Sequence, residues 1–201
     1  MKKFKLTYDW PIEPGRYLTS NPFSPVGVVV ILSAPYDSIP KTTEELVRAG
    51  VEKGAGISGT LQTANIGIEK IAVNLISNPN IRYLILAGSE SGHFPADALK
   101  ALFKNGTNDK GYILNTKAPT AILKNIPKEA IYRLRQQIQL IDLGGVVDLK
   151  VLGEAVWSCY QEKETPFEVE GRNYRLYDIG PFPKEPVIYR LTDRLKTEQD
   201  E

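Results

Sequence analysis

Histidine and cysteine are almost absent from this chain, whose 201 residues include one of each, His93 and Cys159. A single cysteine excludes an intrachain disulfide and fits a reducing compartment. One histidine and one cysteine far apart in sequence also exclude a zinc site of the usual Cys/His spacing. A Ser-His-Asp triad would have to use His93, and no G-x-S-x-G motif accompanies it.

An excess of one charge and long apolar runs are lacking as well. The 25 basic and 24 acidic residues leave a formal net charge of +1, which argues against a nucleic-acid partner or a charged membrane surface. No apolar run approaches the roughly 20 residues that a bilayer span requires. The start of the chain, MKKFKLTYDWPIEPG, lacks the apolar segment of a secretory signal. We therefore expect a cytoplasmic protein with no membrane span and no nucleic-acid partner.

What the sequence does contain is an alternation of buried-type strands and amphipathic helices. Continuous apolar runs predict strands, and apolar residues at helical spacing predict helices between them. This alternation is typical of an α/β fold, a Rossmann-like and mostly parallel sheet with helices on both faces. Strands are predicted at 26–32, 57–62, 81–87, 112–115 and 138–143, and helices at 42–51, within 63–80 with its end at Asn78-Pro79, at 95–104, within 118–137, and at 147–159.

Composition divides the chain into three parts. Residues 1–25 are proline-rich and aperiodic, which indicates an N-terminal arm laid over the surface. Residues 26–160 form the predicted Rossmann-like domain. In residues 161–201, apolar and polar residues alternate around Gly171-Arg172-Asn173, which favours a small C-terminal β extension, a hairpin followed by a solvated tail.

A glycine-rich stretch, GAGISG, matches the spacing G-x-G-x-x-G of dinucleotide-binding loops through Gly54, Gly56 and Gly59. That motif works only where a strand precedes it and a helix follows. Here a predicted helix precedes the glycines, so the context of a dinucleotide site is missing.

His93 lies in a different glycine-containing loop, with five residues between it and the predicted strand 81–87 and one residue before the predicted helix. In open α/β sheets, ligands bind beyond the carboxyl ends of strands, in loops of this kind. Gly88, Ser89, Ser91 and Gly92 carry little side-chain bulk, so a large flat ligand could approach the backbone. The imidazole could serve as a base, a hydrogen-bond donor or a metal ligand, or simply be an exposed loop residue.

Several stretches around this loop resemble the corrinoid A subunit of tetrahydromethanopterin S-methyltransferase from methanogenic archaea. The similarity is carried by WPIEPGRY, SPVGVVVIL, TANIGIEKIAVNLISNPNIRYLILAGSESGH, LKALFKNG and NIPKEAIYRLRQQIQLIDL, which together cover roughly Trp10 to Leu143. The resemblance implies a Rossmann-like fold that holds cobalamin. It also implies methyl transfer from a methyl-tetrahydropterin to a thiol, with methyl-donor and methyl-acceptor methyltransferase proteins as partners.

The resemblance further implies that His93 is the lower axial ligand of cobalt. The cofactor-binding residues it suggests are His93, Gly88, Ser89, Glu90, Ser91, Gly92, Thr63, Asn65, Gly67, Ala118 and Pro119. A ligating histidine usually donates its other N–H to an acceptor, for which Glu90, Ser91 and Asp97 are candidates. Thr63 and Asn65 are also good helix N-cap residues in their own right.

The sequence departs from the family in three places. The loop before His93 is one residue shorter, and Leu61 and Ala64 stand where a cysteine and an acidic residue are expected. The tail from Glu162 is not expected in the methanogenesis subunit but resembles an extension found on soluble relatives. Three hypotheses therefore stay open. The chain is a corrinoid carrier rather than a complete enzyme, a cofactor-free binding or regulatory module that recognises a pterin or nucleotide, or a hydrolytic or transfer enzyme that uses His93 with Ser89 or Ser91.

Overall fold

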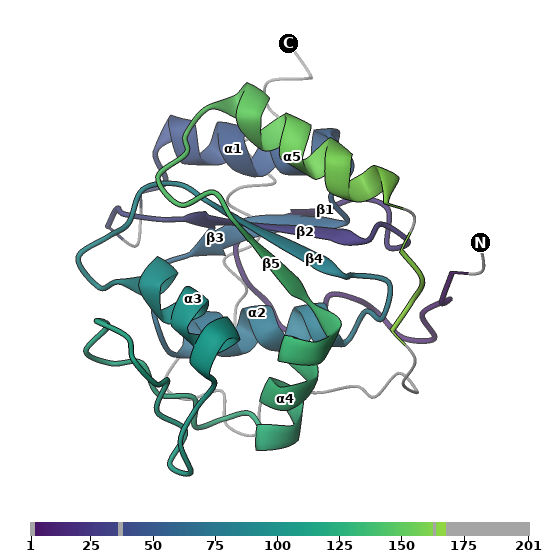
Figure 1. Cartoon of the computed structure of the whole chain (residues 1–201). Coiled ribbons are helices and arrows are strands. Elements are labelled where there is room, and N and C mark those ends of the chain that lie inside the picture. The colour runs from purple at the N-terminus through teal and green to yellow at the C-terminus, as the bar shows by residue number, and fades with distance from the viewer. Residues whose placement is uncertain (1–2, 36–37, 163, 168–201) are drawn as a thin grey trace.

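The computed structural model describes residues 3–35, 38–162 and 164–167 and shows one sheet between two layers of helices (Figure 1). The α/β fold expected from the sequence is confirmed, and helices cover both faces of the sheet. The strands are β1 (Tyr17–Thr19), β2 (Val26–Ile31), β3 (Ile57–Leu61), β4 (Tyr83–Ala87) and β5 (Gln139–Asp142). The helices are α1 (Lys41–Glu52), α2 (Ile66–Ile76), α3 (Pro95–Asn105), α4 (Lys128–Gln137) and α5 (Leu149–Gln161).

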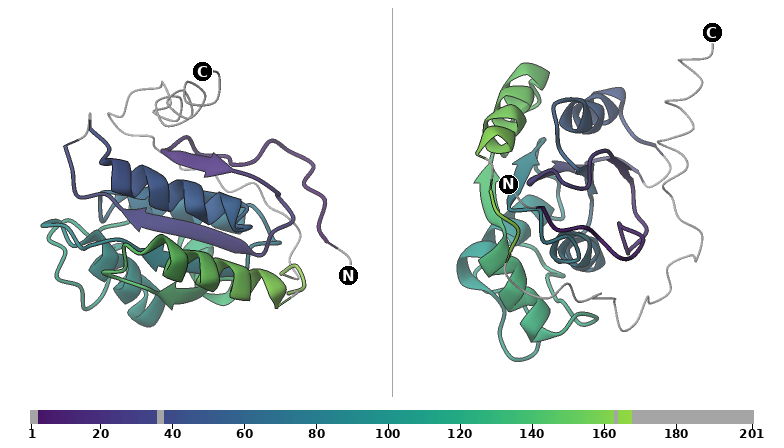
Figure 2. Two further views of the ribbon diagram at one scale, coloured as in Figure 1. Left: turned by 90° about the horizontal axis from the view of Figure 1, so that it is seen from above. Right: turned by 90° about the vertical axis from the view of Figure 1, so that its right-hand side faces the viewer.

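The sheet has the strand order β1-β3-β2-β4-β5, in which β2 to β5 run parallel and β1 is antiparallel to β3. Helices α1 and α5 lie on one face, next to each other, and α2, α3 and α4 lie on the other (Figures 1 and 2). The connections after β2 and β4 lead to helices on opposite faces. In doubly wound sheets, the point between two such neighbouring strands is the topological switch point, where ligands bind.

The central strand β2 explains why this architecture forms. All six of its residues are buried, as expected for a strand with helices on both faces. A Cβ at Gly27 would lie 3.0 Å from a methyl carbon of Leu75, so the glycine lets α2 pack closely against the sheet. Two apolar clusters result, a larger one between the sheet and α2, α3 and α4, and a smaller one beneath α1 and α5.

Two local predictions were wrong. The arm of residues 1–25 is not wholly irregular, because Tyr17–Thr19 forms β1 and pairs with Ile57–Gly59. Residues 112–115 do not form a strand; Tyr112 and Ile113 make only isolated bridges to Ile122 and Thr107. The predicted hairpin around Gly171-Arg172-Asn173 lies outside the described residues.

Buried asparagines near the end of α2 hold the N-terminal arm. The Asn74 amide donates to the carbonyl of Glu13 and accepts from its N–H, at 2.8 and 2.7 Å. The Asn80 amide pairs in the same way with the backbone of Phe4, at 2.9 Å each. These four bonds satisfy backbone groups of an irregular segment, which explains how a proline-rich arm stays fixed on the domain.

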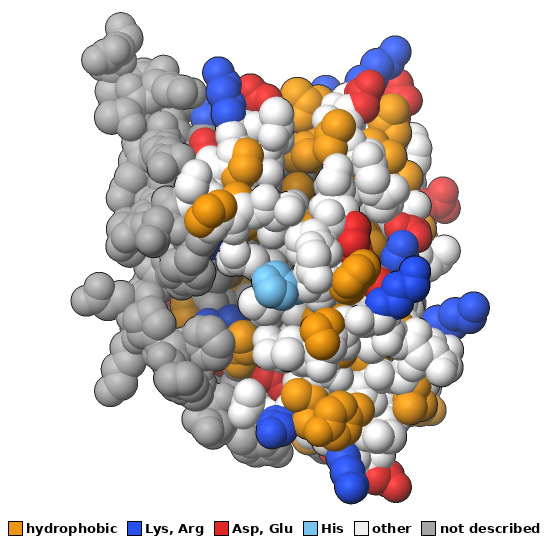
Figure 3. Space-filling model, turned by 90° about the vertical axis from the view of Figure 1, so that its left-hand side faces the viewer, with side chains coloured by type: hydrophobic (Ala, Val, Ile, Leu, Met, Phe, Trp, Pro, Cys, Tyr) orange, Lys and Arg blue, Asp and Glu red, His pale blue; other side chains and the backbone are white. Residues whose placement is uncertain are grey.

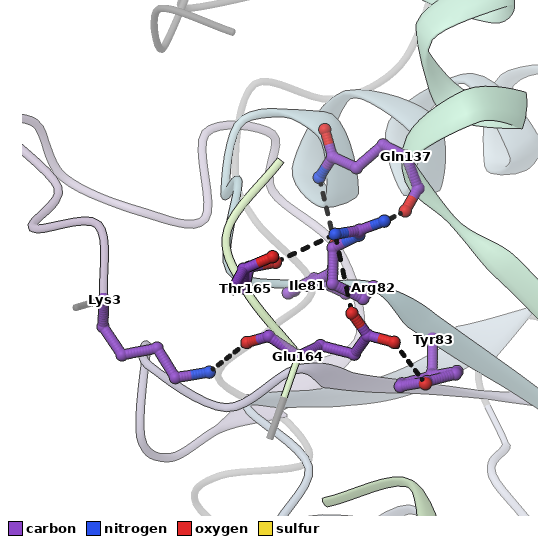
Figure 4. A network of polar contacts seen from close by, with 7 residues as sticks. All are labelled: Lys3, Ile81, Arg82, Tyr83, Gln137, Glu164 and Thr165. Atoms are coloured by element: carbon purple, nitrogen blue, oxygen red, sulfur yellow. Dashed lines mark hydrogen bonds and ion pairs between the residues drawn. The ribbon is translucent and has the colours of Figure 1, made fainter. Parts of the chain in front are cut away.

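A short segment after α5, residues 164–167, crosses the amino edge of the sheet, and we call it the strap (Figure 4). The Arg82 guanidinium donates to the carbonyl of Thr165 at 2.9 Å and pairs with the Glu164 carboxylate at 3.8 Å. The Tyr83 hydroxyl donates to Glu164 at 2.9 Å, and the Lys3 ammonium donates to the Glu164 carbonyl at 3.0 Å. Burial, followed by the hydrogen bond to Glu164, raises the pKa of Tyr83 to about 12.

The strap includes Phe167, whose ring is in contact with two guanidinium groups. The Arg82 and Arg133 guanidinium carbons lie 5.7 and 5.6 Å from the ring centroid, within the range of cation–π contacts. The Phe167 N–H donates to the carbonyl of Pro79 at 2.9 Å. The chain therefore leaves α5 and is bound at the amino edge, opposite the edge that carries the loop of His93.

Candidate functional site at the carboxyl edge of the sheet

The loop between β4 and α3 places His93 at the carboxyl edge of the sheet, beside the switch point between β2 and β4. The His93 side chain is exposed. Figure 3 shows the histidine near the middle of this face, surrounded mainly by backbone and uncharged side chains. The site predicted from the sequence therefore lies where the topology of the sheet would place a ligand.

Gly88, the first residue of this loop, is buried in contact with β2. Its φ is +86°, and a Cβ at this position would lie 3.0 Å from the backbone nitrogen of Ile31. Its N–H donates to Val146, and its carbonyl accepts from Gly145, at 2.8 and 2.9 Å. Gly88 thus joins the β4–α3 loop to the β5–α5 loop and leaves no space for a ligand beneath it.

The β5–α5 loop is a part of this edge that the sequence analysis missed. Its residues follow the predicted strand 138–143 and precede a predicted helix, the same strand-end position that singled out His93. Val147 and Leu149 in this region are exposed, with 57% and 42% of their surfaces accessible. The Gly144-Gly145 pair after the predicted strand was the sequence feature that could have indicated this loop.

Glu90 bonds to the backbone on both sides of His93. Its carboxylate accepts hydrogen bonds from the backbone N–H groups of Ser91, Ala96 and Asp97, at 3.0, 3.2 and 2.8 Å. It therefore occupies the N-terminus of α3, where a carboxylate satisfies free N–H groups and the helix dipole. No hydrogen bond joins Glu90 to His93 in the described residues.

The residues on either side of His93 form a tight turn that leads into α3. The Phe94 N–H donates to the Ser91 carbonyl at 3.0 Å, and Phe94 has a φ of 53°, in the left-handed region. A non-glycine residue there is strained and is held by its surroundings. A Cβ at Gly92 would meet nothing within 4 Å, so the outer side of the turn is open.

The hydroxyl of Ser91 is the polar group of this turn that remains available. Its Oγ is buried and has no hydrogen-bond partner among the described residues. A buried hydroxyl without a partner costs free energy unless a ligand or water satisfies it. Ser89 is exposed beside it.

Thr63 and Asn65 belong to the β3–α2 connection, and Gly67 lies in the first turn of α2, on the same edge but separated from the β4–α3 loop by β2. The Asn65 side chain accepts from the N–H of Ile66 at 2.8 Å, and the Thr63 hydroxyl accepts from that of Gly67 at 3.1 Å. A Cβ at Gly67 would lie 2.9 Å from this hydroxyl. These residues cap α2, which is the structural role the sequence allowed for Thr63 and Asn65.

Ala118 and Pro119 lie in a loop that is tied to the first turn of α3. The Asp97 carboxylate accepts from the Thr116 hydroxyl at 2.8 Å and from the Lys117 N–H at 2.7 Å. Burial acts to raise the pKa of Asp97, but these hydrogen bonds and nearby lysine charges outweigh it and lower the pKa below its ordinary value. Ala118 is buried and Pro119 is exposed. Asp97 therefore supports this loop rather than the His93 imidazole.

The GAGISG stretch begins after α1 at the opposite edge and continues into β3. A Cβ at Gly56 would lie 2.8 Å from the Asn21 carbonyl oxygen, and one at Gly59 would lie 2.6 Å from that of Arg16. These glycines permit close packing of the N-terminal arm, so the interpretation against a dinucleotide loop agrees with the structure.

The arrangement can offer one nitrogen ligand to a metal that brings its other ligands with it. The described residues contain no group of three or more His, Cys, Asp or Glu side chains that could hold a metal ion. A flat chelated metal is therefore a better match to the exposed His93 than a bare ion.

None of the helices in the described ranges has the length and apolarity that a membrane crossing requires.

Comparison with known proteins identifies the family. The family model for the A subunit of tetrahydromethanopterin S-methyltransferase matches residues 3–178, which extends beyond Leu143 and into the tail from Glu162. The chain is 40% identical to the A subunit of this methyltransferase from Methanocaldococcus jannaschii over 168 residues, 80% of this chain and 66% of that protein. It is 36% identical to the A subunit numbered 2 from Methanothermobacter marburgensis over 196 residues, 96% of this chain and 92% of that protein.

The relatives differ in how much of their length is shared. The chain spans about two thirds of the first of these relatives and nearly the whole of the second. The A subunit numbered 2 from Methanothermobacter thermautotrophicus is 32% identical over 203 residues, 100% of this chain and 97% of that protein. The C-terminal segment thus has a counterpart in the A subunits numbered 2, and the chain belongs to the family of the A subunit of tetrahydromethanopterin S-methyltransferase.

Proposed function

We propose that this chain binds cobalamin, with His93 as the axial ligand of cobalt on the protein side, and carries a methyl group between partner methyltransferase proteins. The donor would be a methyl-tetrahydropterin and the acceptor a thiol. The observation that carries the proposal is the position of the only imidazole, exposed beside the topological switch point in a loop with little side-chain bulk. When bound, cobalamin would supply a cobalt centre that accepts and releases the methyl group.

The residues around His93 fit a large, flat ligand. The open side of Gly92 leaves room for a ring to approach the imidazole. The buried Ser91 hydroxyl, which has no partner among the described residues, can bond to a polar group of the ligand. His93 would contribute its lone pair as a neutral imidazole. Gly88 would keep the base of the loop against β2, so that the imidazole points away from the sheet.

The alternative of a cofactor-free module that recognises a nucleotide has less support. Nucleotide phosphates in such folds bind at helix N-termini. At α3 the free N–H groups already donate to Glu90, and at α2 they donate to Asn65 and Thr63. The starts of α2 and α3 are therefore satisfied by the chain itself. A pterin ring carries no phosphate, so the occupied helix N-termini do not count against a pterin ligand.

A hydrolytic role for His93 has less support still. A nucleophile and its base are normally within hydrogen-bond reach. No hydrogen bond joins His93 to Ser89 or Ser91 in the described part of the chain, and the Ser91 Oγ has no partner there.

The proposal is tested by loading the purified protein with hydroxocobalamin, removing free cobalamin on a desalting column and recording the visible spectrum. We expect the wild type to retain cobalamin and His93→Ala to retain less, with a shifted spectrum. A colourless wild-type protein would overturn cobalamin binding. Equal retention with the same spectrum in both proteins would overturn the ligand assignment.

A further inference from the structure

We infer that Glu90 is a positioning residue, which holds the turn from Ser91 to Phe94 in the conformation that presents His93 to its ligand. The inference rests on the function proposed above and concerns how the same site is organised. Glu90 does not touch the imidazole, and it acts through the backbone on both sides of it.

The hydrogen bonds of Glu90 join the two ends of the turn. One carboxylate oxygen accepts from the Ser91 N–H, before His93, and from the Ala96 N–H, after it, at 3.0 and 3.2 Å. The other oxygen accepts from the Asp97 N–H at 2.8 Å. Because one side chain binds both ends, the distance between the two ends of the turn is fixed. His93 lies near the middle of this turn.

We call these three hydrogen bonds of Glu90 the clamp. The conformation of Phe94 shows why the turn needs it. Phe94 precedes α3 with φ 53° and ψ 43°, and it provides no side-chain hydrogen bond to cap the helix. Left-handed backbone at a non-glycine residue is strained and persists only where neighbouring contacts hold it. Glu90 provides those contacts and also the missing cap, from six and seven residues upstream.

The clamp also explains the choice of a carboxylate at this position. Three backbone N–H groups converge on it, and the N-terminus of α3 carries partial positive charge. A glutamine at this position keeps one acceptor oxygen, but its NH₂ group replaces the other oxygen and cannot accept the third hydrogen bond. Glu90→Gln should therefore retain part of the clamp, and Glu90→Ala should remove it.

The test uses Glu90→Ala, Glu90→Gln and, as a control, Glu129→Gln, which changes a carboxylate in the first turn of α4, away from the site. In protein without cobalamin, ¹⁵N relaxation would give backbone order parameters for Ser91 to Phe94. We expect about 0.85 in the wild type and in the control, and below about 0.6 in Glu90→Ala. Glu90→Gln should lie between them. Unchanged order parameters in Glu90→Ala would overturn the inference.

The second measurement is the dissociation constant for hydroxocobalamin. Residues that orient a metal ligand typically change metal affinity by about 10–100-fold, so we expect Glu90→Ala to weaken binding at least tenfold while the control binds as the wild type does. Equal affinity in Glu90→Ala and wild type would overturn the inference. A wild type that binds no cobalamin would instead overturn the proposed function, and the order parameters would still decide whether Glu90 fixes the turn.

Discussion

At the amino edge of the sheet, polar side chains bind one another and the backbone, whereas at the carboxyl edge they hold their own loop or a neighbouring one and leave a surface open. Arg82, Gln137 and Glu164 at the amino edge join segments more than 50 residues apart. At the carboxyl edge, Glu90 and Asn65 each bond to backbone within seven residues of themselves. His93 and the Ser91 hydroxyl take no part in these bonds among the described residues.

The side chains of the two edges therefore differ in what they do: those at the amino edge stabilise the fold, and the exposed ones at the carboxyl edge are available for binding. A closed network of buried hydrogen bonds favours a single arrangement of the chain, and losing one member leaves others unsatisfied. An edge with locally satisfied loops keeps its shape without its exposed groups. Substitutions at the amino edge should therefore lower stability, and substitutions of exposed groups at the carboxyl edge should change binding.

The largest effect on stability is expected from Gln137→Ala at the amino edge. The Gln137 amide donates to the carbonyls of Leu75, Asn78 and Ile81, at 3.1, 3.0 and 3.2 Å. Its loss removes these buried bonds and should lower the free energy of unfolding by about 3 kcal/mol. Gln136→Ala, which changes the exposed neighbour, should cost less than about 0.5 kcal/mol. Urea unfolding followed by circular dichroism measures both, and equal losses would contradict the contrast between the edges.

A smaller loss is expected from Gly88→Ala at the carboxyl edge. The left-handed backbone and the close approach to Ile31 should together cost about 1–2 kcal/mol. Gly92→Ala in the same loop adds a methyl group in open space and should change stability by less than about 0.5 kcal/mol. Thermal unfolding of the two variants compares them directly. A Gly92→Ala protein as unstable as Gly88→Ala would show that the turn is packed rather than open.

The smallest effect is expected from Asp97→Asn, and it should depend on pH. Because the pKa of Asp97 is lower in the folded state, the unfolded chain binds more protons below about pH 4, so this group stabilises the fold more as pH rises. The wild type should be more stable than the variant near pH 7, by less than about 1 kcal/mol for a partly exposed group. The difference should vanish as pH falls through the lowered pKa. A difference independent of pH would contradict this account.

The sequence predicted the parts of the fold that depend on local pattern. The continuous apolar runs at 26–32 and 81–87 form β2 and β4, whose residues are all buried. The stretches predicted at 57–62 and 138–143 contain β3 and β5. Pro95 begins α3 and Gly106, with φ +74°, ends it, as their local preferences indicate. β1 was not predicted, because its three residues have no strand pattern of their own and form a strand through their pairing with β3.

The site was predictable in position but not in detail. The strand-end rule placed His93 at the carboxyl edge, where the structure has it. The role of Glu90 could not be read from the sequence, because its partners are backbone groups up to seven residues away, brought to it by the turn at Phe94. The strap was also unpredictable, since the contacts of Glu164 with Arg82 and Tyr83 depend on the tertiary fold.

The most direct test of the central claim uses the fact that the chain has one histidine. Protein labelled with ¹⁵N only in histidine is loaded with cobalamin, which is then reduced to the Co(II) state and examined by electron paramagnetic resonance. If the His93 nitrogen binds cobalt, the triplet superhyperfine splitting of the unlabelled protein should become a doublet in the labelled one. A triplet in both samples would show that cobalt keeps a nitrogen ligand of its own, and it would contradict the assignment of His93.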